Sequence, residues 1–187
     1  MDVQRCLWVS QDPQYLEYHD KVWGRQVYDS QELFAKLCLD GQQAGLSWLT
    51  VLKKQANYEA AFAQFDPAKI ALFDEVKVEA LMQNSGIIRN RLKVNSIIKN
   101  ARAYMAFTGG GNDFSTFLWD FVGGEVRHNA FVHGSEIPAQ TNESEAMSKA
   151  LKKLGFNFVG PTICYAFMQA VGMVNDHTLD CFCYSEG

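Results

Sequence analysis

The stretch Leu154-Gly155-Phe156-Asn157-Phe158-Val159-Gly160-Pro161-Thr162 joins two segments whose apolar residues recur with the period of a helix. Gly155 stands where the left-handed residue that follows a helix belongs. A glycine-bearing turn that leads into a helix presents unpaired backbone N–H groups at the positive end of the helix dipole. Such a turn can hold one phosphate of a nucleic-acid backbone without reading its sequence. We therefore predict a hairpin between two helices over residues 155–161, with Gly155 and Gly160 as contact residues.

Three lysines lie on the helix that precedes this hairpin. Lys149, Lys152 and Lys153 approach the turn and add local positive charge, and Lys153 is the candidate for a contact with DNA. A simpler interpretation stays open, because a glycine-rich link between helices is often only a connection and lysines on a helix face are usually just solvated. A second basic segment, residues 86–93, also opens a helix and has the same two interpretations.

Helical periodicity continues outward from the hairpin, and strict apolar–polar alternation is nearly absent. Apolar residues fall on one helical face in the stretches 58–65, 97–105, 114–121 and 147–154. Glycine-rich or irregular segments separate them at 108–112 and 123–141. The pattern predicts an all-α protein of about seven to nine helices.

Capping residues predict several helix ends. Ser30 is predicted to cap a helix that runs to about Cys38, and Asp66 to cap a helix that begins with Pro67. A capping box is predicted from Asn142 to Glu145, and Gly155 and Gly172 are predicted as left-handed residues that follow helices.

Length and composition set outer bounds. With 187 residues the chain can form one large domain or two small lobes. A net charge of -4 argues against a broad nucleic-acid surface but leaves room for one local basic face. No run approaches the roughly twenty apolar residues of a membrane span, and the first residues lack the pattern of a secretory signal. The five cysteines are an odd number, which disfavours a disulfide framework. We expect a cytosolic protein with reduced thiols.

Two cysteines and two histidines at the chain's extremities form a candidate metal site. Cys6 and His19 lie near the start, and His177 and Cys181 are four residues apart, so on a helical turn their side chains would face one way. Two thiolates and two imidazoles are the closed tetrahedral set that structural zinc prefers, with no position left for a metal-bound water. The spacing fits two unrelated buried cysteines and two hydrogen-bonded histidines equally well, and Cys183 competes with Cys181. Cys38 and Cys164 fall in apolar helical patterns and are expected in the core.

The segment Asp40-Gly41-Gln42-Gln43-Ala44-Gly45-Leu46-Ser47-Trp48 holds the densest polar and aromatic chemistry. A packed helix rarely needs Gly-Gln-Gln-Ala-Gly, so a functional turn is predicted here. The aromatic residues Trp8, Tyr15, Tyr18 and Trp23 near the N-terminus can line a flat pocket. Each of them alone also fits core packing, and for Trp23 core packing is preferred.

Blocks along nearly the whole chain resemble the 3-methyladenine DNA glycosylase I family of bacteria, which belongs to the helix-hairpin-helix glycosylases. The blocks that carry the resemblance are Arg5-Cys6, 8–13, Tyr18-His19-Asp20, 41–48, 50–54, 86–89, 158–160, 162–165 and Val174-Asn175-Asp176-His177. The resemblance implies a single glycosylase domain over residues 1–187. Its two lobes would be the termini with zinc, and a central helical lobe with the hairpin 155–161 at the DNA face.

The same resemblance implies the site residues. One structural zinc per chain would be held by Cys6, His19, His177 and Cys181, which selects Cys181 over Cys183. A base pocket would be built from Trp8, Tyr15, Tyr18 and Trp48, with residue 40 contacting the base. The family pattern carries glutamate at this position, whereas this chain carries Asp40, whose carboxylate is set back by about 1.5 Å. Leu46 is the candidate for filling the gap left by a flipped base, with a core leucine as the alternative.

The implied activity is hydrolysis of the N-glycosidic bond that releases 3-methyladenine from alkylated double-stranded DNA, by a monomer in the bacterial cytosol. Asn175 falls where related glycosylases place a catalytic aspartate, and no lysine stands out as a Schiff-base nucleophile, so a monofunctional enzyme is expected. The alternatives are a non-catalytic, zinc-stapled protein that binds damaged DNA and, less favoured, a zinc hydrolase, which needs an open metal position.

Overall fold

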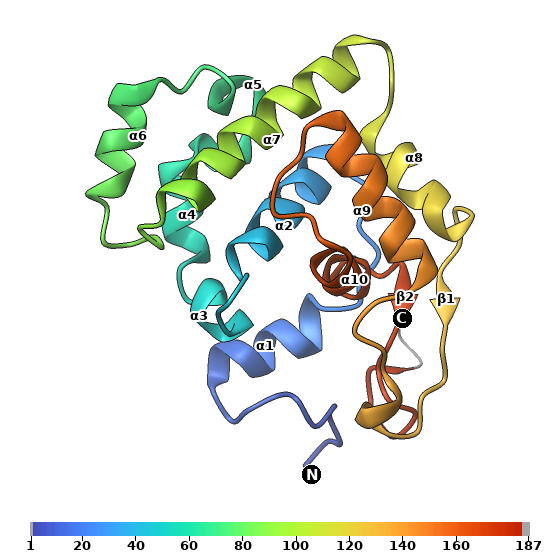
Figure 1. Cartoon of the computed structure of the whole chain (residues 1–187). Helices are drawn as coiled ribbons and strands as arrows, with labels where there is room; N and C mark the ends of the chain where they lie inside the picture. The colour runs from blue at the N-terminus through green and yellow to red at the C-terminus, as the bar shows by residue number, and fades with distance from the viewer. Residues whose placement is uncertain (1, 185–187) are drawn as a thin grey trace.

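A computed structural model describes residues 2–184, and ten α-helices occupy most of that range (Figure 1). They are α1 (Pro13–Lys21), α2 (Ser30–Gln42), α3 (Trp48–Leu52), α4 (Gln55–Ala61), α5 (Pro67–Ile70), α6 (Glu75–Met82), α7 (Arg91–Gly109), α8 (Phe114–Trp119), α9 (Asn142–Leu154) and α10 (Pro161–Ala170). Short 3₁₀ turns lie at Ala63–Phe65, Asp120–Val122 and Gly134–Glu136. The predicted number of helices was too low because α3 and α5, with 5 and 4 residues, are too short for a periodic pattern to show.

The all-α expectation is confirmed apart from one short ladder. Strand β1 (Arg127–His128) pairs in parallel with β2 (Val174–Asn175). This ladder ties the irregular segment 123–141 to the chain just after α10. A two-residue strand carries no alternation pattern, so the sequence did not predict it.

Helices α2 and α10 form the centre of the helical body. α10 packs against both α2 and α9, and α2 also packs against α7, α3 and α8. Figure 1 shows α10 nearly end-on in the middle of the molecule, with α1 below it and α7 running across the top. A large apolar cluster surrounds this centre, and a smaller one joins Tyr18 and Trp23 to Cys6 and Cys181. Trp48 packs against both clusters, so it lies where they meet.

Helix α2 extends further than the sequence predicted. It ends at Gln42 rather than near Cys38, so Asp40 and Gly41 lie in its buried last turn and the turn proper begins at Gln43. The reason is a distant cation, since Lys93 Nζ donates hydrogen bonds to the carbonyl oxygens of Gln42 and Ala44 at 2.9 and 2.6 Å. These bonds satisfy carbonyl groups that the end of a helix otherwise leaves unpaired.

Two predicted caps were wrong by one residue. The N-cap of α2 is Asp29, whose carboxylate accepts from the Glu32 N–H, because the Ser30 hydroxyl instead accepts from Ser115 N–H of α8. The capping box of α9 joins Thr141 to Ser144 rather than Asn142 to Glu145. The cap at Asp66 with Pro67 at the first helical position is confirmed, as are left-handed backbones at Gly155 (φ 102°) and Gly172 (φ 77°).

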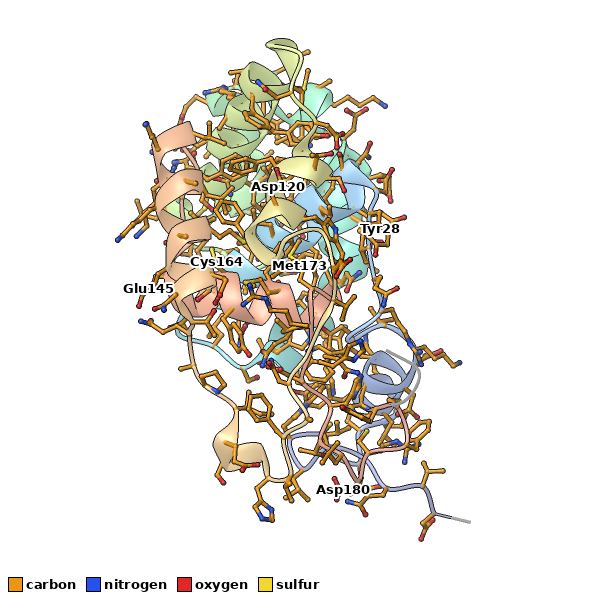
Figure 2. All side chains as sticks on the ribbon, turned by 90° about the vertical axis from the view of Figure 1, so that its right-hand side faces the viewer. Tyr28, Asp120, Glu145, Cys164, Met173 and Asp180 are labelled. Carbon is orange, nitrogen blue, oxygen red and sulfur yellow. The ribbon has the colours of Figure 1, made fainter. Side chains whose placement is uncertain are left out.

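The segments around Gln4 and Phe182, near the two ends of the described residues, lie side by side. Phe182 N–H donates to the carbonyl oxygen of Gln4 at 2.9 Å. Figure 2 shows Cys164 and Met173 within the helical body and Asp180 in the segment at its lower end, beside the N-terminal trace. Cys38 and Cys164 are buried in the large cluster, as expected. None of the helices in residues 2–184 has the length and apolar character to cross a membrane.

Candidate active site and metal centre

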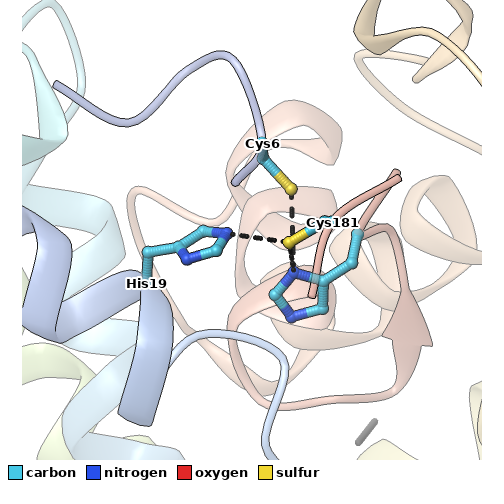
Figure 3. A group of neighbouring side chains, drawn as sticks. Cys6, His19 and Cys181 are labelled. Carbon is cyan, nitrogen blue, oxygen red and sulfur yellow. Dashed lines mark hydrogen bonds between the residues drawn. The ribbon is translucent and has the colours of Figure 1, made fainter. Parts of the chain in front are cut away.

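Cys6, His19, His177 and Cys181 converge on one point, with their ligand atoms all within 4.8 Å of one another and all four side chains buried. The sulfur of Cys181 lies 3.5 Å from His19 Nε2 and 3.6 Å from His177 Nδ1, and the sulfur of Cys6 lies 3.7 Å from His177 Nδ1. Figure 3 shows Cys6 and His19 pointing toward Cys181. In a tetrahedron with Zn–S of about 2.3 Å and Zn–N of about 2.1 Å, the sulfur–nitrogen edge is about 3.6 Å. The cluster therefore has the size and donor set of a zinc site.

Residues around the cluster orient its imidazoles. His19 Nδ1 lies 2.8 Å from Asp20 Oδ1, and Asp20 is held in turn by Arg5 Nη2 at 2.7 Å. A carboxylate behind a histidine is the usual partner that sets the tautomer of a metal-binding ring. Position 24 needs glycine for two reasons. Its backbone is left-handed (φ 81°), and a Cβ there would lie 2.7 Å from His177 Nε2.

The surroundings of Cys181 favour the thiolate form of its side chain. The hydrogen bond from the Cys6 thiol, followed by those from His177 and His19, lowers the pKa of Cys181 against the opposing effect of burial. The thiolate is the form that coordinates metal. Cys183, the competing candidate, groups with His19 and Asp20 but not with His177. The geometry therefore favours Cys181.

A cavity of about 810 Å³ opens beside this cluster. It is lined by the four aromatic residues expected in a base pocket, and Asp40 and Trp23 also reach it. Neighbouring rings follow one another along the wall from Trp8 through Tyr15 and Tyr18 to Trp48, with centroids 5.2, 6.4 and 5.6 Å apart. Their spacing gives the cavity flat apolar faces on which a planar ligand can stack. The segment 133–137, which the sequence did not connect to the pocket, contributes His133, Gly134, Ser135 and Ile137.

Asp40 is the carboxylate of this cavity. It is 2% exposed, and its Oδ1 accepts a hydrogen bond from Lys36 Nζ at 3.1 Å. Its Oδ2 is buried without a hydrogen-bond partner among residues 2–184. Burial raises the pKa of Asp40, and the ammonium of Lys36 opposes that rise. Burial and the charge of Asp40 raise the pKa of Tyr18 well above its usual value, so its phenol stays protonated.

Lys36, which contacts three residues of the pocket wall, is a residue that sequence reasoning missed. Its ammonium also donates to Tyr18 Oη at 3.1 Å and lies 3.4 Å from the centroid of the Trp48 ring. Its position four residues before Asp40 on a helix was the available signal, since such pairs lie on one face.

The predicted hairpin connects α9 to α10. Gly155 and Lys153 are exposed, Gly160 is the N-cap of α10, and Lys149 and Lys152 are exposed beside them. The hairpin rests on α2, because a Cβ at Gly41 would lie 3.0 Å from the carbonyl oxygen of Phe158. This close approach explains the glycine next to Asp40 and places the hairpin against the last turn of α2.

The other candidate positions separate into exposed and internally bonded residues. Leu46 is 40% exposed on the turn after α2, which disfavours the core alternative. In the basic segment 86–93, Lys93 is buried against the end of α2 and Arg91 pairs with Glu75 and Glu79. Asn175 is buried, with its amide bonded to His128 Nδ1 and the Tyr184 carbonyl oxygen, so it has a structural position.

Comparisons with known proteins agree with this arrangement. The family model for methyladenine glycosylase matches residues 8–184. The DNA-3-methyladenine glycosylase 1 of Escherichia coli (strain K12) is 56% identical over 182 residues, which cover 97% of this chain and 97% of that protein. A crystal structure of a 3-methyladenine DNA glycosylase I superposes with a TM-score of 0.96 at 56% identity, covering 96% of this chain and 99% of the other. A variant of a 3-methyladenine DNA glycosylase I, solved in complex with 3-methyladenine, superposes with a TM-score of 0.92 at 38% identity, covering 95% and 96%.

Fold, ring-lined cavity and hairpin define a mostly helical DNA-repair glycosylase. The likeness extends over nearly the full length of each relative. The chain belongs to the methyladenine glycosylase family, in its 3-methyladenine DNA glycosylase I group.

Proposed function

We propose that the protein hydrolyses the N-glycosidic bond of 3-methyladenine in alkylated double-stranded DNA and releases the free base. The observation that carries this proposal is the Asp40 carboxylate, buried at a cavity that Trp8, Tyr15, Tyr18 and Trp48 help to line. The E. coli and crystallised relatives are named for the same reaction. We propose that it acts as a monomer.

The chemistry of the substrate fits this pocket. Methylation at N3 makes adenine cationic and weakens the glycosidic bond, so the base leaves without a strong general acid. The enzyme must extract the nucleotide from the stack and hold it. Electron-rich rings favour a flat cation over neutral adenine. A carboxylate held nearby stabilises positive charge in the transition state.

The bonding of Asn175 and Lys36 favours a monofunctional reaction. Asn175, at the position of the aspartate that activates water or sugar in related enzymes, is bonded into the fold. Lys36, which contacts the pocket residues, donates hydrogen bonds from its ammonium to Asp40 and Tyr18, so this group is not available to form a Schiff base. We infer that a water molecule attacks the sugar once the base departs, and that the DNA strand stays intact.

We also propose that the Cys6–His19–His177–Cys181 cluster holds one zinc ion with a structural role. Four protein ligands complete a tetrahedral shell, so bound zinc would supply a rigid crosslink between the chain ends and no reactive water. The Trp8 ring packs 5.3 Å from the His19 ring, centroid to centroid. The crosslink would thereby fix one wall of the base pocket.

Contacts with DNA are proposed at one face. The hairpin with Gly155 and Gly160 would hold a backbone phosphate, Lys153 would add charge, and Leu46 would fill the gap left by the flipped base. The two apolar clusters support a single domain of two lobes, a helical lobe and a lobe of the chain ends. Because chromosomal DNA is the substrate, we place the protein in the bacterial cytosol.

A base-release assay tests the function. The protein is incubated with methylated duplex DNA, and the released bases and the strand are identified chemically. We expect free 3-methyladenine and an abasic site in an uncut strand. Binding to methylated DNA without any base release, even with enzyme in excess, would instead support the non-catalytic binding protein.

Replacing Lys153 with alanine tests the DNA face. We expect weaker binding to all duplex sequences and a slope of log K against log salt that is smaller by about 0.9, because one phosphate contact is lost. Fluorescence anisotropy with labelled duplexes at several salt concentrations measures the slope. Lys69→Ala, which removes an exposed lysine paired with Asp66, is the control. An unchanged slope for Lys153→Ala would remove this residue from the interface.

A further inference from the structure

The side chain of Lys36 contacts three pocket residues at once. Its ammonium donates to Asp40 Oδ1 and to Tyr18 Oη, both at 3.1 Å. It also lies 3.4 Å from the centroid of the Trp48 ring, within the range of a strong cation–π contact. Lys36 comes from the same helix as Asp40, whereas Tyr18 lies on α1 and Trp48 begins α3. One cation thus links three elements behind the wall of the cavity.

This contact determines how Asp40 meets the cavity. Lys36 holds one oxygen of the carboxylate, which restricts rotation of the short side chain. The other oxygen, Oδ2, is buried and has no hydrogen-bond partner among residues 2–184. A buried acceptor of this kind normally finds a polar partner, and the cavity that Asp40 lines is where a ligand can supply one.

The charge of Lys36 matters as much as its position. Burial raises the pKa of Asp40, and Lys36 is the group that opposes this rise. Tyr18 from α1 and Cys164 from α10 also sense the charge of Asp40, but their pKa values are raised and they stay neutral. Burial also lowers the pKa of Lys36, and the charge of Asp40 and its hydrogen bond oppose that fall, so each group favours the charged form of the other. Within residues 2–184 the positive charge that faces Asp40 therefore belongs to Lys36. A buried carboxylate that loses its cation takes up a proton instead of staying charged.

We propose that Lys36 is a positioning residue for base excision, which anchors Oδ1 of Asp40 and so presents Oδ2, as a carboxylate, to the cationic base. The inference rests on the excision of 3-methyladenine proposed above. The side chain of Asp40 is one methylene shorter than glutamate. Lys36, on the same helix, fixes the position of its carboxylate, so the site does not depend on the length of the side chain.

Lys36→Met tests the proposal, since methionine keeps an unbranched side chain without the charge. Release of 3-methyladenine from methylated duplex DNA is measured between about pH 6 and pH 8.5, a range that brackets neutral pH. We expect the rate of base release by the wild type to change little across this pH range. Lys36→Met is expected to be about tenfold slower at the acid end and to recover as pH rises and Asp40 ionises. Lys36→Arg, which keeps the cation, should restore a flat profile.

A matched control and a second readout make the outcome decisive. Lys21→Met breaks an exposed lysine–carboxylate pair with the same four-residue spacing, Glu17–Lys21, and should leave the profile unchanged. Carbon-13 NMR of the Asp40 carboxyl group needs no activity, and it should show titration near neutral pH in Lys36→Met but not in the wild type. A charged Asp40 throughout this range in Lys36→Met, or a loss of activity that is equal at every pH, would overturn the proposal. If the wild type released no base, the NMR result would still decide the role of Lys36.

Discussion

Replacing Asp40 with asparagine is expected to slow the release of 3-methyladenine by about a hundredfold, the loss seen when one preorganised electrostatic group is removed from an active site. The substitution keeps the shape of the side chain and removes its charge. Asp40 lines the cavity with one oxygen paired to Lys36 and the other without a hydrogen-bond partner in the described part of the chain. An amide in its place cannot balance the positive charge on the departing base.

Single-turnover release from methylated duplex DNA measures the effect. The deficit of Asp40→Asn should be the same at every pH, because no carboxyl group remains to titrate. Glu17→Gln, which removes an exposed carboxylate of α1, serves as the control for charge. Thermal unfolding shows whether the variant is folded. Undiminished excision by folded Asp40→Asn would take this residue out of the mechanism.

Replacing Cys181 with serine is expected to abolish stoichiometric zinc binding and to lower the free energy of unfolding by about 4 kcal/mol or more, as losses of structural metal do. Cys181 contacts both histidines of the cluster, so its loss removes one of the four ligands and two sulfur–nitrogen contacts. The chain ends would then be joined mainly by backbone contacts such as that between Phe182 and Gln4. Excision should fall as well, because Trp8 packs on the His19 ring.

Zinc content by elemental analysis and urea unfolding test this expectation. Cys183→Ser is the matched control, since Cys183 is equally buried but does not group with His177. It should keep one zinc ion per chain. One equivalent of zinc in Cys181→Ser, or none in the wild type, would contradict the proposed ligand set. Residual base release by a metal-free variant would agree with a zinc ion that takes no part in the chemistry.

Features that depend on a few neighbouring residues were predictable. The cap at Asp66 and the left-handed Gly155 depend on backbone hydrogen bonds within one turn of a helix. The longer helices were visible because each buries one periodic face. The caps of α2 and α9 were missed by one residue, since adjacent polar residues such as Asp29 and Ser30 have similar capping ability. Contacts with α8 selected between those two.

Features that depend on distant partners were not predictable from local patterns. The buried last turn of α2, which carries Asp40, is completed by Lys93, more than fifty positions along the chain. The close approach of Phe158 gives Gly41 a packing role in the last turn of α2, where the sequence predicted a functional turn. The four-residue spacing could have predicted that Lys36 pairs with Asp40. It could not have predicted the contacts of Lys36 with Tyr18 and Trp48, because those residues lie on other helices.

The amino-acid sequence by itself determined the helical class, the donor chemistry at the two chain ends and, through its resemblance to a known family, the aromatic residues of the pocket. Helical period and residue chemistry are properties of short stretches, so they can be recognised without coordinates. The same resemblance selected Cys181 over Cys183, and the geometry of the cluster favours the same residue. Only the tertiary structure decided that Asp40 is buried with one oxygen unpaired among residues 2–184, and that Lys36 stands behind it. Those outcomes depend on how whole helices pack, because burial and close approach are set by partners that lie far apart along the chain.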